Sequence, residues 1–137
     1  MKGDSIFYRD GYKYQLFKTC QILIDIHPPA DIITDYILLN REGMLSIMRG
    51  YTWNGPDVIP DTPSVMRGSL VHDVGYQLLR EGCLAQSYRE PIDNLMRSIC
   101  LEDGTLHAYA EAIYLGVQLG AGPAADPAND RPVIEAP

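Results

Sequence analysis

The first half of the chain alternates apolar and polar residues in the way that β-strands do. Residues 21–26 carry an isoleucine at every second position, which places Ile22, Ile24 and Ile26 on one face and predicts a half-buried strand. Apolar runs at 36–39 and 44–48 flank a short polar stretch, the pattern of a β-hairpin. Residues 50–63 are so rich in Gly, Pro, Asn and Asp that we expect a loop there.

In the second half the apolar spacing changes to the helical period, and three helices are predicted. The first covers about 63–81, with Thr62 as its N-cap. The second begins at 87–90, where Ser and Glu stand at the spacing of a capping box. The third covers about 105–119, with Thr105 as its N-cap, and is bounded by glycine at each end. A small sheet followed by helices predicts an α+β domain.

We therefore expect residues 1–120 to form a single α+β domain, with a small antiparallel N-terminal sheet followed by about three helices. Residues 121–137 hold 4 of the 10 prolines and show no periodic apolar face. This composition predicts an extended, Pro/Ala-rich C-terminal arm. Such an arm would lie on its own domain or bind a partner, either another protein or a second copy of the chain.

Charge and hydropathy exclude several classes of protein. The chain has 11 Lys and Arg residues against 18 Asp and Glu residues, a formal net charge of −7. This balance argues against binding to nucleic acid or to an anionic membrane surface. No apolar run is long enough for a membrane span, and the N-terminus lacks the apolar stretch of a secretory signal. We expect a protein that stays in the cytoplasm in which it is made.

The first predicted helix carries the most informative polar group, His72. Gly68, His72 and Gly75 share one face of this helix. Two glycines inside a helix cost roughly 1 kcal/mol each relative to alanine, so we expect another backbone or a ligand to approach this face closely. Tyr76 lies one turn after His72, within reach of the same surroundings, whereas Asp73 points about 100° away around the helix.

Two interpretations of these side chains remain open. In the first, His72 is an acid/base or a metal ligand, and Asp73 is a second ligand or orients the imidazole. In the second, a buried His–Asp network pins the loop to the helix. Asp93 stands between Arg89 and Arg97 at helical spacing, so it either belongs to a solvated ion-pair row or lies beside His72 and Asp73.

The loop before the first helix contains Trp53 and Asn54. Asn54 and Gly55 form a turn signal, because both residue types tolerate positive φ. Trp53 would either fill the core or stack against a ligand. The sequence contains no GxSxG elbow, P-loop, HExxH or GxGxxG motif.

The segments 50–56 and 67–77, followed by Arg89 and Asp93, resemble domain-of-unknown-function family 1353, which is common in tailed phages and prophages. That family joins a G-[FY]-x-W/T-D-G-[AP]-S loop to an H-D-x-[LI]-Y helix and a later R-x-x-[AD]-D helix. Residues 112–120 resemble its final helix, and the resemblance extends from about 43 to 120. It implies a phage or prophage setting, in the cytoplasm of an infected or lysogenic bacterium or in the virion, but it supplies no reaction.

The resemblance also favours a single site built from His72, Asp73 and Asp93. The chain departs from the family at Asn54, where Asp is usual, and this change removes a potential base or ligand from the loop. It departs again at Gly75, where an aliphatic residue is common.

Two functions follow as hypotheses. In the first, the protein is hydrolase-like: His72 is the acid/base or a ligand, and Asp73 and Asp93 orient it or join it in holding a divalent metal. Trp53, Asn54 and Tyr76 would then contact the substrate. In the second, the protein is a non-enzymatic virion component or accessory protein whose arm, residues 121–137, binds a partner subunit.

Overall fold

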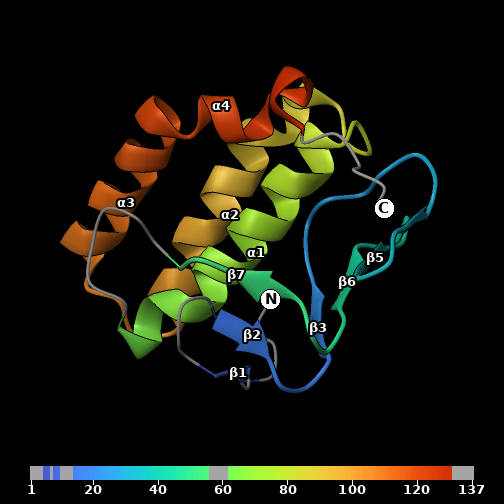
Figure 1. The fold of residues 1–137 in the computed structure, drawn as a ribbon. Helices are drawn as coiled ribbons and strands as arrows, with labels where there is room; N and C mark the ends of the chain where they lie inside the picture. Colours follow the sequence, from blue (N-terminus) through green and yellow to red (C-terminus); the bar gives the residue numbers. More distant parts are fainter. Residues whose placement is uncertain (1–4, 7, 10–13, 56–61, 131–137) are drawn as a thin grey trace, which may run out of the picture.

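The computed structural model describes residues 5–6, 8–9, 14–55 and 62–130. It is an α+β fold in which α1, α2 and α3 lie side by side and the strands gather on the other flank of α1 (Figure 1). The strands are β1 Tyr8–Arg9, β2 Tyr14–Leu16, β3 Cys20–Leu23, β4 Ile32–Ile33, β5 Ile37–Leu39, β6 Met44–Ile47 and β7 Thr52–Trp53. The helices are α1 Pro63–Arg80, α2 Arg89–Glu102, α3 His107–Gly120 and α4 Gly122–Ala125, with 3₁₀ turns at Gln86–Tyr88 and Pro127–Asn129.

The strands form two small antiparallel sheets within the described residues. One has the order β1-β2-β7 and the other the order β3-β6-β5-β4. The predicted hairpin is confirmed: β5 pairs with β6, and the turn between them uses Gly43 at φ +90°. The prediction of a loop throughout 50–63 is wrong at its start, because Thr52 and Trp53 pair with β2. Residues 56–61 of that predicted loop lie outside the described residues.

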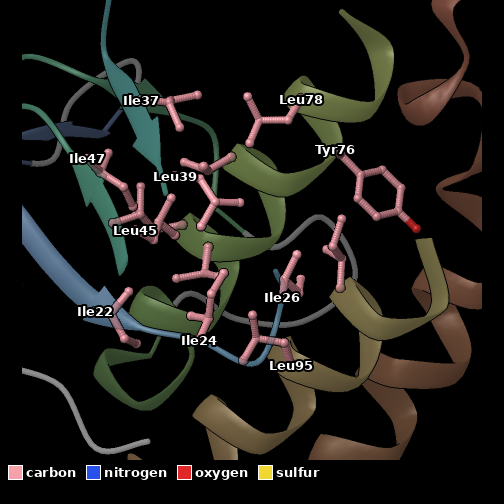
Figure 2. Packing of buried hydrophobic residues seen from close by; sticks show 14 of the residues in the cluster. Ile22, Ile24, Ile26, Ile37, Leu39, Leu45, Ile47, Tyr76, Leu78 and Leu95 are labelled. Carbon is pink, nitrogen blue, oxygen red and sulfur yellow. The ribbon is translucent and has the colours of Figure 1, made fainter. Parts of the chain in front are cut away.

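The core lies between the four-stranded sheet and α1. Ile22, Ile24 and Ile26 are all buried, as their alternation predicted. Together with Ile37, Leu39 and the apolar residues of β6, they face the side of α1 that carries Leu78 (Figure 2). Tyr76 stands at the border of this cluster, with its hydroxyl oxygen directed away from the labelled aliphatic side chains (Figure 2). The same helix therefore supplies the core on one face and polar groups on another.

Glycine sets the distance between α1 and α2. A Cβ atom at Gly68 would come within 2.6 Å of Cys100 Sγ, and one at Gly75 within 2.8 Å of Ile92 Cγ2. The expected close approach on this face is confirmed, and the element that approaches is α2. His72 lies between the two glycines, so it stands at the closest contact of the two helices.

The helix boundaries agree with the prediction, but the expected caps do not form. Thr62 has the extended backbone of an N-cap without a capping hydrogen bond from its side chain. Thr105 does not cap α3; its hydroxyl donates instead to the carbonyl of Ser64 on α1. The capping box at 87–90 is replaced by a 3₁₀ turn that leads directly into α2. Short polar side chains near helix starts have several backbone partners within reach, and tertiary contacts choose among them.

The expected extended conformation of residues 121–137 is wrong for 122–129. These residues form α4 and a 3₁₀ turn, and they fold back onto α1 (Figure 1). Arg80 Nη1 donates to the carbonyl of Ala124 at 2.8 Å, and Ala125 is fully buried. The remaining part of the expected arm, 131–137, lies outside the described residues. No helix in the described part of the chain is long and apolar enough to cross a membrane.

Candidate functional site

A buried polar cluster links α1 to α2 beside the glycine contacts. His72 and Tyr76 stand one turn apart on α1, and both reach the same oxygen of Asp93 on α2. His72 Nε2 lies 2.8 Å from Asp93 Oδ1, and the Tyr76 hydroxyl donates to that atom at 2.7 Å. The two rings contact each other, with centroids 4.1 Å apart. Asp93 has no solvent exposure, and His72 is only 7 % exposed.

The cluster extends to α3 through two residues that complete its hydrogen bonds. Gln118 Nε2 donates to Asp93 Oδ2 at 2.9 Å, so the carboxylate has a donor on each oxygen. Arg89 Nε donates to the Tyr76 hydroxyl at 3.1 Å, and its Nη2 donates to the carbonyl of Gln118, also at 3.1 Å. Asp93 therefore contacts His72, Tyr76 and Gln118 rather than forming the ion-pair row with Arg89 and Arg97.

The network determines where the protons lie. Burial raises the pKa of the Tyr76 phenol above its ordinary value, and the hydrogen bond to Asp93 raises it further, while Arg89 acts in the opposite direction. The neutral phenol donates to Asp93 and accepts from Arg89. A carboxylate only accepts, so in the neutral form of the His72 ring the proton lies on Nε2 and is donated to Asp93. The lone pair of His72 therefore lies on Nδ1.

The Nδ1 atom of His72 has no hydrogen bond to any described residue and belongs to a residue that lines a cavity. The atom is also not fully buried, because among the described residues Arg67 Nη1 is the one side-chain nitrogen or oxygen that is both fully buried and without a hydrogen bond. His72 lines a cavity of about 720 Å³ bounded by the 51–55 segment, α1, α3 and α4. Cavities of this size hold small-molecule ligands in many proteins.

The 51–55 segment forms one wall of this cavity. Trp53 is buried, and its indole N–H donates to Ser69 Oγ at 3.2 Å, one turn before His72. Tyr51 donates its hydroxyl to Gln77 Oε1 at 2.9 Å, which ties the same segment to the next turns of α1. Asn54 is exposed at the edge of the cavity. Of the predicted substrate contacts, Trp53 thus belongs to the supporting wall, whereas Asn54 presents its side chain.

The structure does not join Asp73 to the cluster. Asp73 lines the cavity, but no contact links it to His72 or Asp93 in the described part of the chain. Nor do three or more His, Cys, Asp or Glu side chains gather there in a group that could hold a metal ion. The donor set around His72 is a phenol, an amide and one carboxylate, which suits a hydrogen-bonded network better than a cation. The chemistry that the site supports is therefore proton transfer at His72.

Two members of the site, Gln118 and Ser69, were not predicted from the sequence. Gln118 is the one strongly polar residue in the segment 112–120, and that isolation is a signal for a buried partner. Ser69 gives no such signal, because serine within a helix more often bonds its own backbone, as its contact with the Met66 carbonyl shows.

Comparisons of the chain with protein-family models, with curated proteins and with solved structures found no match.

Proposed function

We propose that this chain is a phage- or prophage-associated, hydrolase-like protein in which His72 is the general base. One observation supports the hydrolase-like site above the others: a buried imidazole that is fixed by a carboxylate on Nε2, has no partner on Nδ1 within the described part of the chain and belongs to the lining of a ligand-sized cavity. Among the described residues, protein groups satisfy Nε2 alone, which leaves Nδ1 available to water or a ligand. The phage setting is supported by the resemblance of segments 50–56 and 67–77 alone.

In this proposal each group has a stated task. Nδ1 of His72 takes a proton from a water molecule that attacks the substrate. Asp93 holds the ring in the correct tautomer and stabilises the imidazolium that forms. Tyr76 and Gln118 act as positioning residues, because they hold Asp93 rather than touch the substrate.

The test is a hydrolysis screen of the full chain against neutral acyl esters, acyl amides, phosphate esters and glycosides. We expect one class to be cleaved, and His72→Asn to lower the rate by roughly 10²–10⁴-fold, the usual contribution of a general base. Asp93→Asn should also lower the rate and change the pH–rate profile, since the amide cannot stabilise an imidazolium. Glu90→Gln, an equal change of charge on the exposed side of α2, is the matched control. A rate that is unaffected by His72→Asn contradicts the proposal.

A specific observation also favours the second function, a non-enzymatic virion or accessory protein. Four large apolar side chains in or next to α3 are strongly exposed: Leu106, Tyr109, Leu115 and Leu119. Such exposed side chains offer apolar area that a partner could cover. Residues 121–130 lie on their own domain, so the partner subunit or second copy would meet α3 or residues 131–137. Mass spectrometry of purified particles separates the two forms of this function, because presence in particles supports a virion component and absence supports an accessory role.

A further inference from the structure

The outer side of α3 is an exposed apolar surface. α3 forms the edge of the helical layer away from the strands (Figure 1), and its buried residues are Ala110 and Ile113. The opposite side of the helix carries four exposed apolar residues at spacings of four, three and four, which we call the α3 seam: Ala108, Ala112, Leu115 and Leu119. This spacing is that of the contact line between two packed helices.

The sizes of these residues make the α3 seam complementary to itself. The two alanines occupy its first half and the two leucines its second half. Two copies of α3 can pack antiparallel about a two-fold axis that passes between positions 112 and 115. Ala108 of each copy then lies opposite Leu119 of the other, and every leucine of the seam packs against an alanine. A parallel pair would instead place alanine opposite alanine and leave a gap.

Charge also favours this surface for contact with a second copy. The chain has a net charge of −7, so two copies repel each other wherever their carboxylates meet. The α3 seam is uncharged, and Glu111, which is the only acidic residue in α3, is paired with Arg97 at 3.1 Å. In the antiparallel arrangement Glu111 lies level with residue 116 of the other copy, so the two carboxylates do not face each other.

The size of the surface predicts a weak dimer. α3 has 14 residues, and a helix of this length spans roughly 21 Å. Leu106 is 68 % exposed and Tyr109 is 56 % exposed, and both lie at the N-terminal end of α3, where they would extend the contact. A single pair of helices this short buries less than the roughly 1,200–2,000 Å² of total surface that is typical of stable complexes. We therefore expect a dimer that dissociates on dilution.

We propose that the α3 seam is the contact surface for a second copy of the chain, with the two α3 helices antiparallel about a two-fold axis. Association would remove Leu115 and Leu119 from water, and this loss of exposed apolar surface is its driving force. The inference does not depend on the proposed function of His72, because none of the four residues of the α3 seam lines the cavity.

The test is sedimentation velocity of the full chain over a wide range of protein concentration. We expect a shift from monomer to dimer as the concentration rises. Leu115→Glu should weaken the dimer by at least about tenfold, because it places a carboxylate in an apolar contact. Ile33→Glu is the matched control: Ile33 is 76 % exposed on β4, outside the α3 seam, and its replacement should leave the dimer unchanged. Circular dichroism should show that both variants keep the fold, since both positions are exposed.

Three results overturn the inference. The first is a chain that stays monomeric at every concentration. The second is a dimer that Leu115→Glu does not weaken, because the contact must then lie elsewhere. The third is equal weakening by Leu115→Glu and Ile33→Glu, because the effect would then come from added charge anywhere on the surface.

A cross-linking experiment tests the direction of the two helices. Cys83→Ser removes the exposed native thiol, and in this background one batch carries Ala108→Cys and a second carries Leu119→Cys. Mild oxidation of the mixed batches should join unlike chains by a disulfide, because these two positions lie opposite each other. Neither batch should cross-link when it is oxidised alone, since identical positions lie roughly 16 Å apart along the helices. Cross-linking of either batch alone overturns the antiparallel arrangement.

Discussion

Asp93 is the residue on which the polar contacts of the helical half converge. A carboxylate without exposure is costly to bury unless its oxygens are well supplied with donors. His72, Tyr76 and Gln118 provide these donors from α1 and α3. The residue types of the cluster could be identified from the sequence, because His72 and Tyr76 share a face of one helix. The contact of Asp93 with Gln118 on α3 could not be predicted from the sequence, since it depends on how a third helix packs against the other two.

Cys100 leads to a prediction about alkaline pH. Burial, with a contribution from Asp103, raises the pKa of its thiol from 9.0 to about 11. The unfolded chain therefore loses this proton at a lower pH than the native protein does. The resulting contribution to stability is complete below about pH 9 and is lost as the pH rises towards 11. Urea denaturation between pH 8 and 11, read by circular dichroism, should show the free energy of unfolding falling over this range.

The variant Cys100→Ala should have a smaller fall over the same range. Part of the fall should remain, because burial also raises the pKa of Tyr51 and Tyr76. An identical slope in the wild type and the variant would show that the Cys100 thiol does not contribute.

At the scale of elements, the pairing of α1 with α2 sets the site geometry. Gly68 and Gly75 allow the helices to approach on either side of His72, and the distance from His72 to Asp93 follows from that approach. The sequence predicted a close contact here from the cost of two helical glycines. The sequence could not show whether the approaching group was a ligand or a helix, because a glycine leaves room for either one.

Gly75→Ala should separate the two helices. Its Cβ would lie 2.8 Å from a methyl group of Ile92, and overpacking of this kind costs about 1–3 kcal/mol. The midpoint of urea denaturation should fall, and the signals of the His72 ring should shift. Gly120→Ala is the matched control, since a Cβ there meets nothing, and it should leave stability nearly unchanged. Equal midpoints for the two variants would mean that the contact with α2 is not tight.

At the scale of the whole molecule, the C-terminal segment 121–130 is part of the cavity wall. Pro123 and Ala124 line the cavity, and Gln86 Nε2 donates to the carbonyl of Ala125 at 2.8 Å. A composition rich in proline and alanine predicted an extended arm because it shows no helical period. The segment is short, and its fold comes from contacts with α1 rather than from its own propensity, so the sequence pattern gives no sign of it.

Truncation after Gly120 should open the cavity and destabilise the protein. Arg80 and Gln86 lose acceptors at Ala124 and Ala125, and each lost hydrogen bond costs roughly 1 kcal/mol. We expect the free energy of unfolding, measured by urea denaturation, to fall by about 2 kcal/mol.

Truncation after Asp130 is the control, because it removes only residues 131–137. If both truncations have the same effect on stability, the contacts of segment 121–130 with Arg80 and Gln86 do not stabilise the protein. If removal of residues 131–137 alone abolishes assembly with a partner, the function as a virion or accessory protein gains support.

The contacts between α1 and α2 run in an antiparallel register. Proceeding along α1, Arg67 meets Asp103, Gly68 meets Cys100, and Gly75 meets Ile92. Each residue of an α-helix is rotated by about 100° from the one before it, so deleting one residue inside either helix would turn every later pair out of register. Insertions in the connection at 81–88 leave both helices in phase. Insertions in that connection should therefore be tolerated where they leave the buried Leu84 and the contact of Gln86 with Ala125 in place, whereas changes of length within the helices should not.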